Sequence, residues 1–91
     1  MEAFSFTVRG KVQGVFFRKH AVAEATRLSL RGYIRNAEDG SVVGEAAGAA
    51  AGVASFRLWL ARGSPKSRVD SVSVVQLDAA TVGEAGFEVK G

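Results

Sequence analysis

Residues 4–28, FSFTVRGKVQGVFFRKHAVAEATRL, contain a strand pattern, a turn with glycines and a helix pattern in direct succession. Apolar and polar residues alternate from Phe4 to Val8, which is the period of a half-buried strand. After Gly10 and Gly14, an apolar residue recurs at every third or fourth position, as on one face of a helix. The positions of this face are Phe17, Ala21, Ala25 and Leu28. The stretch therefore predicts a strand, a glycine-containing loop and a helix that ends near Leu28.

A hairpin and a second helix are predicted next. Residues 33–37 and 41–47 are expected to be strands joined by the turn Glu-Asp-Gly at 38–40, because Asp-Gly is a strong hairpin signal. Gly44, inside the second of these strands, predicts a weak spot or a bulge. Residues 50–61 are expected to form a helix, because apolar residues recur there at helical spacing and Pro65 lies just beyond its end. These apolar residues are Val53, Phe56 and Leu60.

The last third of the chain is rich in strand-forming residues. Residues 69–77 alternate with a change of phase near Val74 and Val75, so we expect either a bulge or burial on both faces there. Residues 79–85 are expected to form a loop and residues 87–90 a short last strand. The order of elements predicts two helices on one face of an antiparallel sheet, with an additional short C-terminal strand. The predicted fold class is α+β, a ferredoxin-like split βαβ sandwich.

Length and composition limit the classes of protein that fit. The 91 residues, of which 47% are hydrophobic and 23% are charged, fit one globular domain, expected to span residues 1–91. The lack of cysteine excludes disulfides, thiol catalysis and cysteine-ligated metals, and the single histidine, His20, excludes a multi-histidine metal site within one chain. No apolar run is long enough to span a membrane, and the N-terminus does not resemble a signal peptide. We therefore expect a cytoplasmic protein.

Positive charge is concentrated around the glycine-containing loop. The formal net charge is only +3, but residues 3–23 hold no acid and four basic residues, Arg9, Lys11, Arg18 and Lys19. A loop between a strand and a helix can direct several backbone N–H groups at one anion, and Arg18 can add bidentate hydrogen bonds. The alternative is an ordinary turn with a solvent-exposed arginine. The Walker and dinucleotide-binding glycine patterns are absent, which disfavours an NTPase or a Rossmann enzyme.

The loop sequence resembles the signature of a known family. Gly10-x-Val12-Gln13-Gly14-Val15-x-Phe17-Arg18 is similar to the acylphosphatase signature at every fixed position. The second signature of that family is matched by Gly32-Tyr33-Ile34-Arg35-Asn36, with Gly40-x-Val42 and Gly48 at the expected spacing. The resemblance spans nearly the whole chain. It implies the fold predicted above and hydrolysis of the carboxyl–phosphate bond of acyl phosphates, without a metal or another cofactor, to a carboxylate and inorganic phosphate.

The resemblance also implies roles for individual residues. Arg18 would bind the phosphoryl oxygens, and Asn36 would hold and orient the attacking water. Backbone N–H groups of the loop would surround the phosphoryl group. The loop residues are Gly10, Lys11, Val12, Gln13, Gly14, Val15, Phe16 and Phe17. The expected partners are a small acyl phosphate and inorganic phosphate, the latter as product and competitive inhibitor. We expect a monomer that binds neither nucleic acid nor a membrane.

A few positions depart from the family pattern. Ser29 stands where a glycine usually ends the first helix, and a serine there would strain a left-handed cap or force a different one. Ser64 and Ser67 lie in the region where the family has a proline-containing turn after the second helix. These departures concern folding or stability, and neither Arg18 nor Asn36 is affected.

Two other functions fit parts of the sequence. RNA-recognition domains share this order of strands and helices, but the predicted strand at residues 41–47 lacks the aromatic residues on which they stack bases. An acylphosphatase-like domain can also serve as a sensor or as one part of a carbamoyl-phosphate-processing assembly. The chain ends after its own terminal strand, so a free-standing enzyme is expected. A turnover assay on a small aromatic acyl phosphate distinguishes these possibilities.

Overall fold

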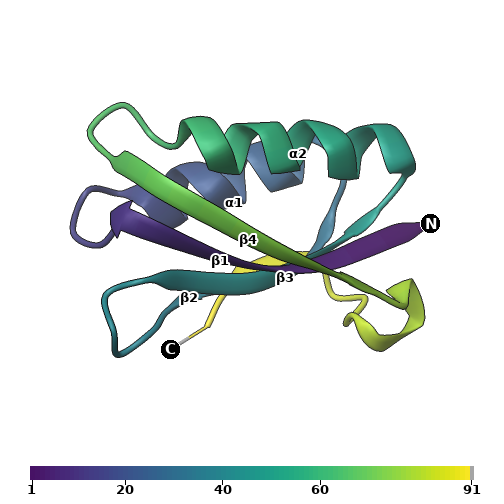
Figure 1. Ribbon diagram of the computed structural model, residues 1–91. Coiled ribbons are helices and arrows are strands. Elements are labelled where there is room, and N and C mark those ends of the chain that lie inside the picture. Colours follow the sequence, from purple (N-terminus) through teal and green to yellow (C-terminus); the bar gives the residue numbers. More distant parts are fainter. Residues whose placement is uncertain (91) are drawn as a thin grey trace.

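Two helices lie side by side on one face of a five-stranded sheet in the computed structural model, which describes residues 1–90 (Figure 1). The strands are β1 (Glu2–Lys11), β2 (Arg31–Asn36), β3 (Val42–Gly48), β4 (Arg68–Leu77) and β5 (Phe87–Val89). The helices are α1 (Phe17–Arg27) and α2 (Ala50–Arg62), and a 3-10 helix, η1, spans Ala79–Thr81. The predicted ferredoxin-like α+β fold is confirmed. No helix within residues 1–90 has the length and hydropathy needed to cross a membrane.

The strands are ordered β4-β1-β3-β2-β5 across the sheet. The first four pair antiparallel, as predicted, but β5 runs parallel to β2, so the sheet is mixed. The path of the chain explains this direction. β4 ends with Leu77 opposite Ala3, and β2 starts at that same end of the sheet, with Arg31 opposite Ala47. A segment that crosses this end of the sheet enters β5 beside the start of β2, and the two strands therefore run the same way.

The apolar faces predicted from the sequence meet between the helices and the sheet. Phe6 and Val8 of β1 lie in one buried cluster with Phe17 of α1 and Phe56 of α2. Full burial of such a side chain stabilises the fold by roughly 1.5–3 kcal/mol. Trp59 belongs to the same cluster, as expected for an aromatic residue on the inner face of α2. This core fixes α1 on the sheet and thereby fixes the loop that precedes it.

A second, smaller cluster on the opposite face explains the change of phase in β4. Val74 packs against the main core, whereas Leu77 packs against the second cluster. That cluster consists of Ala3, Ala47 and Val82. A bulge near Val74 is therefore wrong, and burial on the second face holds for Leu77 but not for Val75, which is 63% exposed. The register between β1 and β4 shifts instead between Arg9 and Gly10.

The predicted bulge at Gly44 is also absent. β3 passes this residue without a register shift, with Gly44 opposite Phe6 on one side and Ile34 on the other. A Cβ atom on Gly44 would lie 2.1 Å from the Tyr33 carbonyl oxygen and 2.6 Å from the Phe6 ring, both closer than real Cβ atoms come. Glycine at this position therefore leaves room for a core aromatic ring.

The first helix ends in a left-handed serine. Ser29 has a φ of 58°, its N–H donates to the Thr26 carbonyl at 3.0 Å, and the Leu30 N–H donates to the Ala25 carbonyl at 2.9 Å. This is the Schellman arrangement, in which the left-handed residue is usually glycine. A residue with a Cβ atom loses about 1–2 kcal/mol in this conformation. The predicted strained cap at Ser29 is confirmed.

Candidate active site

Two left-handed residues shape the loop between β1 and α1. Gly14 has a φ of 73° and Phe16 a φ of 58°. Phe16 is the N-cap of α1, and the residue is 68% exposed, so burial in the core does not explain the conformation. A bulky residue in this region of backbone space is an outlier, and such strain is concentrated at functional sites. The buried hydroxyl of Ser64 donates to the Val15 carbonyl at 3.4 Å and holds the loop from the side of α2.

The first turn of α1 presents backbone N–H groups without a side-chain acceptor. The N-cap makes no side-chain hydrogen bond, and the first turn contains no acidic residue. Such a helix start attracts anions through its N–H groups and its dipole. Arg18 is half-buried in this turn. The two ion pairs within residues 1–90 join other residues, Arg27 with Glu24 and Arg68 with Asp70, so none of these acids neutralises Arg18.

Arg18 and the loop line the same cleft. Its volume is about 510 Å³, and it lies between the loop, the first turns of α1 and the last strand. The lining residues are Val12, Gly14, Phe16, Phe17, Arg18, Lys19, Val22 and Val89. The structure thus brings Arg18 together with four of the loop residues implied by the signature. Two cationic side chains and the uncapped helix start make this cleft suited to an anion.

Asn36 is the last residue of β2 and does not line this cleft. It lies at the same end of the molecule, because the β1–α1 loop and the β2–β3 hairpin project side by side beyond the sheet (Figure 1). The side chain of Gln13 joins the two segments by donating to the carbonyls of Ala37 at 2.9 Å and Ser41 at 3.0 Å. The Oδ1 atom of Asn36 is buried and accepts no hydrogen bond within residues 1–90. A buried acceptor without a protein partner is rare, and a bound ligand or water would satisfy it.

Other conspicuous residues lie outside this cleft. His20 faces a separate hollow between α1 and α2 that also contains Trp59 and Arg62. Asp39 belongs to the hairpin turn, as predicted, and accepts hydrogen bonds from the hydroxyl and the N–H of Ser41. The Ser41 hydroxyl, followed by its backbone N–H, lowers the pKa of the Asp39 carboxyl. Lys11 is exposed at the end of β1 and does not line the cleft.

Three lining residues were not singled out by sequence reasoning. Lys19 follows Arg18, and only the general positive charge of the segment pointed to it. Val22 lies one turn further along α1. Val89 comes from β5 and reaches the cleft because it lies opposite Ile34 of β2. The side-chain bonds of Gln13 were likewise not predicted, because the signature implies only its backbone N–H.

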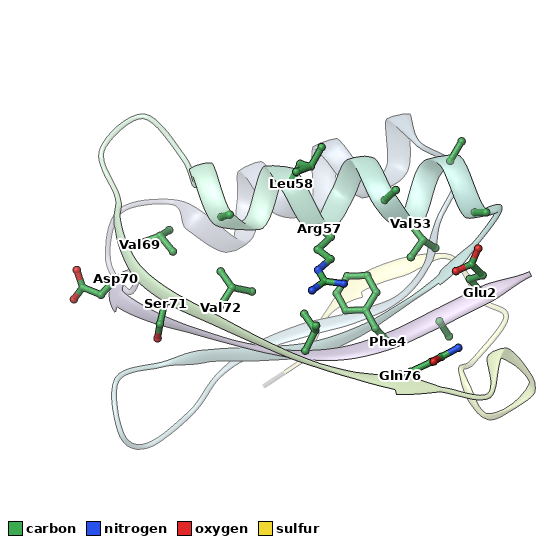
Figure 2. Close-up of a pocket in the computed structure, with 16 residues that line it drawn as sticks. Glu2, Phe4, Val53, Arg57, Leu58, Val69, Asp70, Ser71, Val72 and Gln76 are labelled. Carbon is green, nitrogen blue, oxygen red and sulfur yellow. The ribbon is translucent and has the colours of Figure 1, made fainter.

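A larger groove of about 1180 Å³ lies elsewhere, between α2 and β4. Figure 2 shows Arg57 extending from α2 toward Phe4 in this groove, with Val53 and Leu58 on the same helix. Half of its lining residues are small apolar residues of α2 and valines of β4. The start of α2 lies at this groove with Ala50 and Ala51, but the lining includes two acids, Glu2 and Asp70, and none of the signature residues. The chemistry of the smaller cleft therefore identifies the better candidate for an active site.

Known proteins share both the sequence and the structure. The acylphosphatase family model matches residues 4–89. A curated acylphosphatase of Xanthomonas campestris is 49% identical over 73 residues, which cover 80% of this chain and 83% of the relative. The crystal structure of acylphosphatase from Bacillus subtilis superposes with a TM-score of 0.94 at 33% identity and covers all of both chains. HypF of T. kodakarensis contains the same fold as 12% of a longer chain, with a TM-score of 0.81 at 27% identity over 98% of this chain.

The comparisons agree with the geometry of the loop and the helix start. The family match extends from β1 to β5 and includes the cleft with Arg18. The match in structure covers the whole chain, so it does not depend on the two signatures alone. The chain therefore belongs to the acylphosphatase family, hydrolases that act on acyl phosphates.

Proposed function

We propose that this acylphosphatase cleaves the carboxyl–phosphate bond with its own backbone amides and two side chains, without a metal ion or another cofactor. The observation that carries the proposal is the cleft that Arg18 shares with Gly14 and Phe16 at the uncapped start of α1. A phosphoryl group in this cleft would accept hydrogen bonds from N–H groups of residues 12–17, since Gly10 and Lys11 pair with β4 as part of β1. The planar guanidinium of Arg18 would bind two of its oxygens at once.

Hydrolysis of an acyl phosphate requires few further groups from the protein. The carboxylate of an acyl phosphate is a good leaving group, and phosphoryl transfer through a loose transition state depends on positioning and charge stabilisation. Arg18 and the amides supply the charge stabilisation, and Asn36 holds the attacking water. The unpartnered Oδ1 of Asn36 supports this role, because a bound water would satisfy an acceptor whose burial otherwise costs roughly 1–3 kcal/mol.

The proposed reaction is balanced without a protein base. The water oxygen forms a bond to phosphorus as the bond from phosphorus to the acyl oxygen breaks, and the carboxylate leaves. The proton of the water passes to a phosphoryl oxygen, so the products are a carboxylate and inorganic phosphate. Inorganic phosphate has the same phosphoryl oxygens that the loop binds in the substrate. It is therefore expected to compete with the substrate and to raise the melting temperature of the protein.

Variants of the two side chains test the proposal. Arg18→Ala should weaken phosphate binding and turnover together, because Arg18 touches the phosphoryl group in the bound substrate and in the transition state. Arg18→Lys should restore little, since a point charge does not reproduce the planar fork. Asn36→Ala should lower kcat by on the order of 10²–10³ and leave KM and phosphate affinity nearly unchanged.

The controls address folding, because Asn36 lies beside the β2–β3 hairpin. Circular dichroism and protection by phosphate must be intact before the kinetic constants are compared. A well-folded Asn36→Ala protein with full kcat would show that Asn36 does not position the water. The family, the fold and the anion site would be unaffected by that result.

We further propose that the protein is a cytoplasmic monomer that acts without nucleic acid or a membrane. Sedimentation and cell fractionation test these points. The likeness to part of HypF favours a second candidate, a domain that works within a larger assembly. Phosphate binding without turnover of a small aromatic acyl phosphate would support that candidate over a free-standing enzyme.

A further inference from the structure

We infer that Gln13 is a positioning residue whose side chain sets the separation between the phosphate-binding loop and Asn36. The inference rests on the proposed function, because it assumes that Asn36 orients the attacking water. The family signature implies a backbone role for Gln13. The side chain makes a separate set of contacts, and these join the two halves of the proposed site.

The Gln13 amide binds two points of the β2–β3 hairpin. Its Nε2 atom donates to the Ala37 carbonyl at 2.9 Å and to the Ser41 carbonyl at 3.0 Å. The N–H of Ala37 donates to the same Ser41 carbonyl at 2.8 Å, so both acceptors belong to the closing pair of the hairpin. A primary amide has two N–H groups, and Gln13 uses both here. Within residues 1–90, no other side chain of loop 12–16 is hydrogen-bonded to this hairpin.

These contacts connect the backbone of the loop to the residue next to Asn36. Gln13 lies between Val12 and Gly14, which both line the Arg18 cleft. Ala37 directly follows Asn36, whose Oδ1 is buried and unpartnered. The loop and the hairpin are 24 residues apart at the first contact and 28 at the second, so chain continuity does not fix their separation. The hydrogen bonds of the Gln13 side chain join the loop to the closing pair of the hairpin.

The expected effect follows from the sensitivity of the reaction to geometry. Water must approach phosphorus in line with the leaving oxygen, and a misplacement of about 1 Å can reduce a rate by about 10²-fold. Loss of the Gln13 bonds would free the hairpin from the loop without removing a group that touches phosphate. A positioning role therefore predicts a lower kcat with little change in the binding of substrate or phosphate.

Gln13→Leu is the direct test, because leucine removes both donors and retains similar bulk. We expect kcat to fall about 10- to 100-fold, with KM and the Kd of inorganic phosphate within about twofold of the original values. Gln76→Leu is the matched control, since Gln76 is exposed on β4 and makes no bond to the loop. Unchanged kcat in a folded Gln13→Leu protein would overturn the inference. A loss of phosphate affinity equal to the loss of kcat would do the same, because Gln13 would then act on the loop itself.

A double-mutant cycle separates this inference from the proposed function. Asn36→Ala alone tests the role of Asn36, whatever Gln13 does. When Asn36 is already alanine, Gln13→Leu should lower kcat by no more than about twofold further, because the water it helps to place is no longer held. An equal loss of kcat in both backgrounds would leave the proposed function intact and overturn the role of Gln13.

Gln13→Glu provides a second readout if the leucine variant does not fold. An ionised glutamate has no donor and would face two carbonyl oxygens, which should raise its pKa, whereas the protonated acid regains one donor. The kcat of the folded variant, relative to the original protein, should therefore rise as the pH falls from about 8 to about 5. A ratio that is independent of pH would overturn the inference.

Discussion

Gly14→Ala tests whether the backbone of the loop forms the anion site. The φ of Gly14 is 73°, but a Cβ atom placed there meets no heavy atom within 4 Å. Substitution therefore creates no clash within residues 1–90, and its cost comes from the left-handed backbone alone. That cost is about 1–2 kcal/mol, and the stiffer unfolded chain offsets about 0.4–1 kcal/mol of it. We expect a net loss of about 1 kcal/mol, or a fall of roughly 4–8 °C in Tm for a chain of this size.

Gly83→Ala is the matched control. A Cβ atom at Gly83 also meets nothing within 4 Å, and its φ lies outside the left-handed region. Alanine there should leave the melting temperature unchanged or raise it slightly, since only the unfolded chain is affected. The difference between the two variants isolates the conformational cost at Gly14. An unchanged or higher Tm for Gly14→Ala would refute that assignment.

Inorganic phosphate in the same melting experiment tests the site. A ligand at 100 times its Kd stabilises the folded state by about 2.7 kcal/mol. If alanine at position 14 lowers the affinity for phosphate tenfold, the stabilisation by phosphate falls by about 1.4 kcal/mol. Gly83→Ala should keep the full stabilisation. A β-branched residue at position 14 should lower the affinity for phosphate further. Equal protection by phosphate in Gly14→Ala, Gly83→Ala and the original protein would show that the loop is not where phosphate binds.

Two further predictions concern the end of α1 and the charge stabilisers. Ser29→Gly should raise the free energy of unfolding by about 0.5–1 kcal/mol, because relief of about 1–2 kcal/mol of left-handed strain exceeds the added chain entropy of glycine. Urea unfolding measures this change. Ser55→Gly, on the exposed face of α2, is a control that should lose stability. A Ser29→Gly protein that is less stable than the original would show that Ser29 is not strained. Hydrolysis should also proceed unchanged in a metal chelator, and a strict requirement for a divalent ion would exclude Arg18 and the amides as the sole charge stabilisers.

The fold could be predicted because its main signals are local. The alternation from Phe4 to Val8 and the helical spacing from Phe17 to Ala25 each lie within one element, and both apolar faces are buried as expected. The direction of β5 has no such signal. It follows from where the chain leaves β4 at Leu77, and a short strand of three residues does not encode that path.

The candidate site could be predicted only where its residues are contiguous. The signature identifies the loop and Arg18 because a strand, a turn and a helix start follow each other directly. Val89 enters the cleft through parallel pairing with β2, which the sequence does not reveal. The side-chain contacts of Gln13 could not be predicted from the sequence either. Their acceptors are backbone carbonyls, and every residue type supplies one. Residue type identifies donors better than it identifies such acceptors.

Backbone strain occurs at two non-glycine residues within residues 1–90, Phe16 and Ser29, and it has different consequences at each. At Ser29 the left-handed residue only ends a helix, and glycine would do this with less strain. At Phe16 the left-handed residue begins a helix whose N-cap makes no side-chain hydrogen bond, beside the proposed anion site. Glycine at position 16 would relieve the strain but would also allow the loop many other conformations. An exposed aromatic residue in this conformation therefore fits a loop that is held in one shape by its neighbours, Ser64 on one side and the hairpin bound by Gln13 on the other.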